Sequence, residues 1–142
     1  MERLSAHFTL SELTATSHGP NYPGRTEIEA LRALAVNVLE PIRAGVALAV
    51  HVNSGYRSPA VNAAVGGAAG SQHLRGEAAD IWVSGLTPAE LATRIVALGV
   101  PFDQLIVEPS WVHVSYREGH NRGQMLRKVG NVYSSWVPNA SP

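Results

Sequence analysis

The stretch Ser71-Gln72-His73-Leu74-Arg75-Gly76-Glu77-Ala78-Ala79-Asp80 places an imidazole seven residues before a carboxylate. His73 and Asp80 lack the spacing of three or four residues that puts two side chains on one helix face. In an extended chain they would lie about 20 Å apart. They can therefore meet only if a loop turns back into a strand. Gly76 suits that turn, because glycine adopts a positive φ without steric cost.

A second imidazole, His113, lies in the apolar run Trp111-Val112-His113-Val114. Two histidines and an aspartate leave one position of a zinc tetrahedron open, as in catalytic sites, whereas structural zinc sites are closed and often use cysteine, which this chain lacks. Asp80 and His113 both lie in apolar strand patterns, where an unpaired polar group is costly to bury. We therefore predict one Zn²⁺ ion held by His73, Asp80 and His113, although each residue taken singly has a purely structural explanation.

Length and charge set the broad class of protein. A chain of 142 residues fits a single domain, which we expect to span residues 1–142, with a core of about 8–116 and a tail of 117–142. The formal net charge is zero, so nothing favours nucleic acid as a partner. The N-terminal residues lack a signal-peptide pattern and no stretch is apolar enough to span a membrane. We expect synthesis in the cytoplasm, no membrane insertion and a monomer.

The hydrophobic pattern predicts an α+β fold, a single compact domain in which helices cover a small antiparallel sheet. A capping box of Thr9 and Glu12 opens a short first helix. The expected longer helices run from Glu27 around Pro41 to a stop at Gly45, from Ser58 to about Ala64, and from Thr87 to Gly99. The expected strands are 46–52, 78–83, 102–107 and 111–116, the last two forming a hairpin.

The histidine–aspartate motif resembles that of a known family. Ser71, His73, Gly76, Ala78 and Asp80 reproduce the S-x-H-x-x-G-x-A-x-D signature of the zinc D-alanyl-D-alanine carboxypeptidases and their phage endolysin relatives. The run 111–114 resembles the second metal motif of that family, and residues 54–58 resemble its arginine-bearing loop. The resemblance covers roughly Phe8 to Tyr116.

The resemblance implies roles for individual residues. His73, Asp80 and His113 would hold zinc, and Arg57 would bind the carboxylate of the substrate or polarise its scissile carbonyl. A guanidinium suits either task, because it stays charged and its N–H groups match carboxylate oxygens. Ser71 would shape the loop or hydrogen-bond the substrate rather than act as a nucleophile.

The general base is the point at which the chain departs from this pattern. Many relatives carry an acid three residues before the last histidine ligand, but that position here is Ser110. Glu108 is the nearest candidate. If the hairpin pairs Val107 with Val112, Glu108 lies on the His113 side of the sheet. Pro109 leaves that register open, and Asp103 is the alternative base.

These observations predict a zinc metallopeptidase that cuts peptide bonds in the peptidoglycan stem, as a D-Ala-D-Ala carboxypeptidase or an L-Ala-D-Glu endopeptidase. We expect a phage or prophage endolysin, made in the cytoplasm and acting on the cell wall of the host periplasm after release. The alternatives are a catalytically inactive, zinc-containing wall-binding module and a virion component. The remaining histidines are predicted to be structural or solvated; they are His7, His18, His51 and His120.

Overall fold

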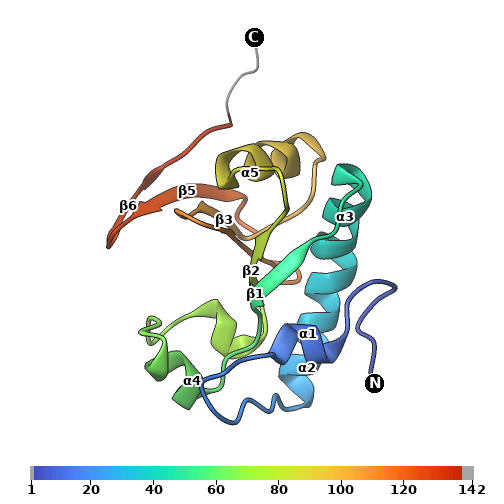
Figure 1. Cartoon of the computed structure of the whole chain (residues 1–142), viewed down its shortest axis with the longest axis vertical. Helices are drawn as coiled ribbons and strands as arrows, with labels where there is room; N and C mark the ends of the chain where they lie inside the picture. The colour runs from blue at the N-terminus through green and yellow to red at the C-terminus, as the bar shows by residue number, and fades with distance from the viewer. Residues whose placement is uncertain (1, 139–142) are drawn as a thin grey trace.

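A six-stranded sheet forms the centre of the molecule, and the computed structural model describes residues 2–138 (Figure 1). The strand order is β1-β2-β4-β3-β5-β6. Four of the five pairings are antiparallel, and the pairing of β3 with β5 is parallel. The strands are β1 His51–Ser54, β2 Ala78–Trp82, β3 Gln104–Val107, β4 Val112–Ser115, β5 Gln124–Val129 and β6 Val132–Ser135.

Three helices begin at the capping residues that the sequence predicts, whereas the helix expected from Glu27 begins two residues earlier, at Arg25. Thr9 and Glu12 form a capping box, as do Thr87 and Glu90, and the Ser58 side chain accepts from the N–H of Val61. The helices and helical turns are α1 Leu10–Thr14, α2 Arg25–Leu34, the π-helix η1 Ala35–Leu39, α3 Glu40–Val46, α4 Pro59–Ala64, the 3₁₀-helix η2 Gln72–Arg75 and α5 Pro88–Ala97. Among the described residues, no helix is long and apolar enough to cross a membrane.

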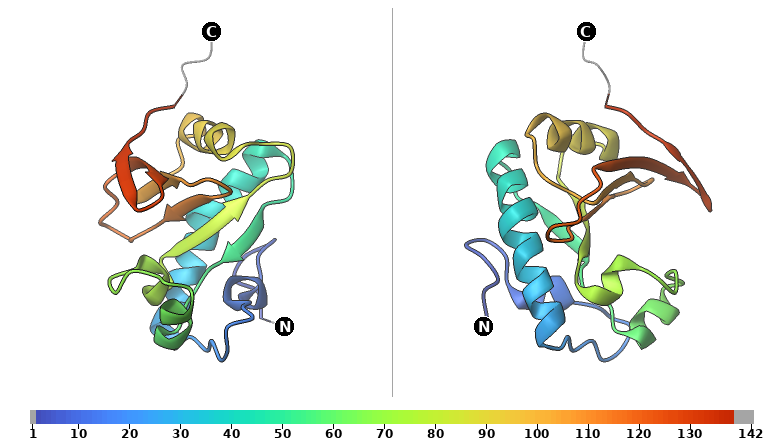
Figure 2. Two further views of the ribbon diagram at one scale, coloured as in Figure 1. Left: turned by 60° about the vertical axis from the view of Figure 1, so that its left-hand side comes forward. Right: turned by 180° about the vertical axis from the view of Figure 1, so that it is seen from behind.

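Helices α2, η1 and α3 run on from one another as a single long helix along the sheet (Figure 2, right). The wider π-helical turn lies just before Pro41. Proline has no N–H and its ring clashes with the carbonyl four residues earlier, and a π-turn relieves such a clash. This explains how the helix continues around Pro41.

Gly45 does not stop the long helix, so that prediction is wrong. Helix α3 runs to Val46, and the chain turns at Ala47, which has φ 58°. Gly45 instead faces Leu98 at the end of α5, and a Cβ at Gly45 would lie 2.4 Å from the Leu98 methyl carbons. The missing side chain therefore allows close packing between two helices.

The two faces of the central strands differ in chemistry. Alternate residues of β2, β3 and β4 belong to the hydrophobic core under the helices; they are Ala79, Ile81, Leu105, Val107, Val112 and Val114. Burial of each valine, leucine or isoleucine side chain in this set contributes about 1.5–3 kcal/mol. The intervening residues include Asp80, Ile106 and His113, and these side chains point to the opposite face because strand residues alternate. The polar groups thus lie outside the core.

Two segments differ from their predicted extent. The expected strand 46–52 begins only at His51 and is a half-exposed edge strand, because Val46 still belongs to the helix and the turn at Ala47 uses the next residues. Within the expected tail, residues 124–135 form β5 and β6, and β5 adds to the sheet parallel to β3. The resulting hairpin projects on the side away from the long helix (Figure 1). The α+β fold with a helix-covered sheet is confirmed, with a larger and mixed sheet.

Candidate metal centre

His73 reaches the site from a single helical turn that is defined at both ends. The Ser71 hydroxyl accepts from the N–H of His73 at 3.2 Å and starts η2. Gly76 ends η2 with φ 71°, and a Cβ there would lie 2.5 Å from the carbonyl oxygen of Glu27 in α2. The predicted turn at Gly76 is confirmed. Glycine is required both for the left-handed conformation and for the close approach to α2.

Asp80 and His113 meet because they are direct cross-strand partners. β2 and β4 pair antiparallel in a register that places Asp80 opposite His113. Opposite residues of an antiparallel pair share one face of the sheet, and their Cβ atoms lie about 5 Å apart. The sheet register therefore brings together two side chains that are 33 residues apart in the chain.

The donor atoms of the three side chains converge on one point. Asp80 Oδ1 lies 3.3 Å from His73 Nε2 and 3.2 Å from His113 Nδ1, and one donor atom from each residue lies within 4.8 Å of the others. Ligands about 2.05 Å from a tetrahedral zinc ion are separated by about 3.3 Å. All three residues are buried. Both the donor chemistry and the spacing fit one zinc ion.

The Asp80 carboxylate is held in its ionised form. Burial acts to raise its pKa, but hydrogen bonds and charge from His113 and His73 outweigh burial and hold the pKa far below its usual range. Its second oxygen, Oδ2, accepts from Arg57 Nη2 at 3.2 Å. An ionised carboxylate is the form that binds a metal ion.

Arg57 lies beside this carboxylate in the loop after β1. Its Nε donates to Ser54 Oγ at 3.0 Å and its Nη1 donates to Asn62 Oδ1 at 3.3 Å. Together with the bond to Asp80, these contacts use three of the five N–H groups of the guanidinium. Two N–H groups are left for a further partner.

Glu108 lies on the wall of the groove that contains the metal group. The hairpin pairs Val107 with Val112 and Ile106 with His113, which is the register that places Glu108 on the His113 side. The main-chain N–H of Glu108 donates to the carbonyl of Trp111 at 3.0 Å and closes the turn. The predicted position is thus observed, while the role of Glu108 as a base stays a prediction.

Asp103, the alternative base, occupies a different environment. Its side chain is fully buried and accepts from Gln72 Nε2 at 2.7 Å and from Arg122 Nη2 at 2.8 Å. Hydrogen bonds from Arg122 lower the pKa of Asp103 to about 2. A carboxylate held in this way by a guanidinium and an amide is poorly suited to take up a proton, so Glu108 stays the preferred candidate for the base.

The groove above the metal group has a volume of about 720 Å³. The glycine-rich loop of residues 65–70 contributes one part of its lining. Lys128 and Tyr133 of the β5–β6 hairpin contribute another, and the Lys128 ammonium lies 5.5 Å from the centre of the Tyr133 ring. The sequence prediction missed this wall, although the apolar residues of 125–133 were a signal that the segment is not a simple tail.

The remaining histidines lie outside the metal group, and among residues 2–138 no second cluster of metal-ligating side chains is found. His7 pairs with Glu40 at 2.7 Å, His18 neighbours Thr16, and the His51 ring stacks on Trp82 at 4.2 Å. His120 is exposed in the connection between β4 and β5. These positions agree with structural or solvated roles.

Two imidazoles and a carboxylate that line a groove form a donor group suited to one metal ion, the arrangement used by hydrolases with a single zinc ion. The sequence model described as Peptidase M15 matches residues 6–115. The chain therefore belongs to the Peptidase M15 family, the D-Ala-D-Ala carboxypeptidase family, and is a metallopeptidase. A search of curated proteins finds no matching relative. The resemblance stated from the motifs is confirmed.

Proposed function

We propose that this protein hydrolyses a peptide bond of the peptidoglycan stem peptide with one zinc ion held by His73, Asp80 and His113. The observation that carries the proposal is the buried donor group of these residues at the floor of a groove of about 720 Å³. The family membership supports a substrate from peptidoglycan. The neutral net charge of the chain agrees with a substrate that is not a polyanion.

Zinc in such a site supplies Lewis-acid activation of the attacking water and of the scissile carbonyl. The chain must then supply a group that accepts the proton of the water and later delivers it to the leaving amine. Glu108 is the acid on the groove wall beside His113, so we assign this proton transfer to its carboxylate. Arg57, with two N–H groups left, would hold a carbonyl or carboxylate oxygen of the substrate.

Ser71 contributes mainly through the loop that carries His73. Its hydroxyl oxygen already accepts from the N–H of His73, while the residue also lines the groove. A hydroxyl engaged in this way still has its own proton to donate to a bound peptide. We therefore keep Ser71 as a residue that shapes the loop and contacts substrate.

Two bonds of the stem peptide are candidates for cleavage, the terminal D-Ala-D-Ala bond and the L-Ala-D-Glu bond. The proposal also includes action as a monomer on the cell wall after release from the cytoplasm, in the manner of a phage or prophage endolysin. Product analysis of digested peptidoglycan by mass spectrometry separates the two bonds. Free D-alanine is the product of a carboxypeptidase, whereas new D-glutamate N-termini are the product of the endopeptidase.

Glu108→Ala is the most informative test. The variant should keep one zinc per chain and lose the ability to reduce the turbidity of cells with permeabilised outer membranes. The matched control is Ser110→Ala, which changes the position of the usual family acid and should leave lysis unchanged. Full activity of Glu108→Ala would exclude Glu108 as the base. A wild-type protein that binds zinc but lyses no cells and cleaves no muropeptide would support the wall-binding module instead.

A further inference from the structure

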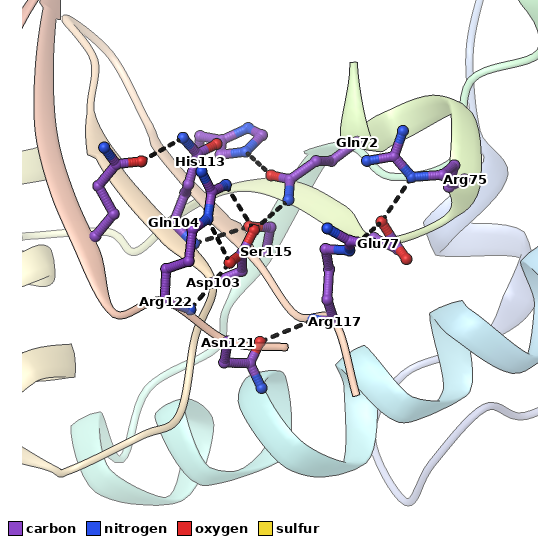
Figure 3. A network of polar contacts seen from close by, with 11 residues as sticks. Gln72, Arg75, Glu77, Asp103, Gln104, His113, Ser115, Arg117, Asn121 and Arg122 are labelled. Atoms are coloured by element: carbon purple, nitrogen blue, oxygen red, sulfur yellow. Dashed lines mark hydrogen bonds and ion pairs between the residues drawn. The ribbon is translucent and has the colours of Figure 1, made fainter. Parts of the chain in front are cut away.

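A chain of polar contacts links the connection after β4 to one of the predicted zinc ligands (Figure 3). Arg122 holds Asp103 with two side-chain contacts, Nε to Oδ1 and Nη2 to Oδ2, both at 2.8 Å. The N–H of Arg122 also donates to Asp103 Oδ1 at 3.0 Å. Asp103 Oδ2 in turn accepts from Gln72 Nε2 at 2.7 Å. Gln72 Oε1 lies 3.4 Å from His113 Nε2.

The contact with Asp103 determines which way the Gln72 amide points. An ionised carboxylate can only accept hydrogen bonds. The amide must therefore turn its NH₂ group to Asp103, and its carbonyl oxygen Oε1 then faces His113. Because Oε1 is an acceptor, the facing ring nitrogen, His113 Nε2, must carry the hydrogen. The lone pair of the neutral ring is then on Nδ1, the atom that lies 3.2 Å from Asp80 Oδ1.

We propose that Gln72, Asp103 and Arg122 act as a positioning chain that holds His113 in its Nε2–H tautomer and so presents Nδ1 to the zinc ion. The inference rests on the proposed zinc site. It assigns no chemical step to these three residues, which act through His113. Metal-ligating histidines usually donate their second ring N–H to an oxygen acceptor, which fixes the ring and its tautomer.

The other histidine ligand shows why His113 needs such a chain. His73 Nδ1 lies 2.7 Å from the main-chain carbonyl oxygen of Gly55. A main-chain carbonyl can only accept a hydrogen bond, so His73 Nδ1 must carry the hydrogen. No further residue is needed to fix this tautomer. A glutamine amide presents either an oxygen or an NH₂ group, and only a neighbour can decide between them. Asp103 makes that decision for Gln72.

Arg122 lies beyond the residues that match the family model, which end at 115. Its side chain is 57% exposed, whereas that of Asp103 is fully buried. The connection is also anchored to the sheet, because the N–H of Gly123 donates to the carbonyl of Phe102 and that of Gln124 donates to the carbonyl of Asp103. The C-terminal segment of this chain therefore helps to hold a ligand of its metal centre.

Three variants test the chain at separate contacts. In Asp103→Asn, an NH₂ group can face Gln72, which favours the flipped amide and the tautomer that cannot bind zinc through Nδ1. Gln72→Met keeps the side-chain volume and removes the acceptor. Arg122→Gln changes an exposed side chain and loosens Asp103. The control is Arg117→Gln, since Arg117 is exposed in the same connection and its side chain reaches Glu77, not Asp103.

The primary measurement is the zinc dissociation constant of the full chain, obtained by competition with a chelator. We expect Asp103→Asn and Gln72→Met to bind zinc about 10- to 100-fold more weakly, with a smaller loss for Arg122→Gln and none for Arg117→Gln. The second measurement is the His113 Nε2–H signal in ¹⁵N-edited NMR spectra of the zinc-loaded protein. It should exchange slowly with water in the wild type and rapidly in Gln72→Met.

Wild-type zinc affinity and a slowly exchanging Nε2–H signal in Gln72→Met and Arg122→Gln would overturn the inference, whether or not Asp103→Asn folds. A wild-type chain that binds no zinc would instead overturn the proposed function on which the inference rests. Zinc binding that weakens together with loss of the Nε2–H signal supports both.

Discussion

Replacement of Asp103 by asparagine should lower the free energy of unfolding by an amount that depends on pH. The carboxylate is fully buried and accepts hydrogen bonds from Arg122 and Gln72. Hydrogen bonds from Arg122 lower its pKa from the ordinary 3.8 to about 2. Because the pKa of the folded state lies below that of the unfolded state, the ionised form stabilises the fold. This contribution is present above the unfolded pKa and is lost as the pH falls through the folded pKa.

The magnitude follows from that difference in proton affinity. Each tenfold change in the acid dissociation constant is worth about 1.4 kcal/mol. The shift of the Asp103 pKa from 3.8 to about 2 therefore corresponds to about 2 kcal/mol of stability at pH 7. At pH 3 the Asp103 carboxyl is protonated in most unfolded molecules but is still ionised in most folded ones. Roughly half of the contribution to the free energy of unfolding therefore remains. Asparagine has no charge to lose, so its own contribution is constant across this range.

The assay is urea unfolding of the metal-free full chain at pH 7, 5 and 3, with chelator present so that zinc release does not contribute. The quantity of interest is the difference between wild type and Asp103→Asn, because the other carboxylates cancel in it. This difference should be nearly equal at pH 7 and 5 and smaller by about 1 kcal/mol at pH 3. Arg122→Gln keeps the Asp103 carboxylate but removes its guanidinium partner. The free energy of unfolding of this variant should therefore also depend less on pH than that of the wild type. A difference that is constant from pH 7 to pH 3 would refute the assignment of the low pKa to this contact.

Three further substitutions test single features of the fold and the site. In thermal unfolding, Gly76→Ala should destabilise the protein by more than Gly66→Ala, which should cost ~1 kcal/mol. Both glycines have positive φ, but only at Gly76 would the added Cβ lie 2.5 Å from a backbone oxygen. Equal losses would show that the close approach is unimportant. Thr87→Ala should cost about 1 kcal/mol in urea unfolding through loss of its capping box and leave zinc affinity unchanged. Arg57→Lys should lower kcat/KM on muropeptides by at least tenfold while zinc stays bound, since lysine cannot reproduce the guanidinium fork beside Asp80; undiminished activity would remove Arg57 from substrate binding.

Local chemistry explains why so much of the fold could be predicted. The capping boxes at Thr9 and Thr87 involve residues three positions apart, so the sequence contains both partners. Alternation in 78–83 and 111–116 has the period of a strand and separates core residues from Asp80 and His113. The register of the hairpin could be predicted only for a given loop length. The observed loop has the length that pairs Val107 with Val112.

Predictions failed where a residue's partner is distant in the chain. Gly45 was interpreted as a helix stop because its packing against Leu98 of another helix leaves no trace in the residues around it. Residues 124–135 were taken as a tail because their strands are formed by pairing with β3, and half-exposed edge strands carry a weak hydrophobic pattern.

The sequence alone determined the donor types of the predicted metal ligands and the turn at Gly76, because a signature of ten residues specifies side chains and a backbone conformation within one short segment. Only the tertiary structure decided which side chains lie against those predicted ligands. Gln72 reaches Asp103 across 31 residues and His113 across 41 residues, and Arg122 joins them from a third segment. Such contacts depend on sheet register and on the path of the connecting loops, which no local pattern encodes.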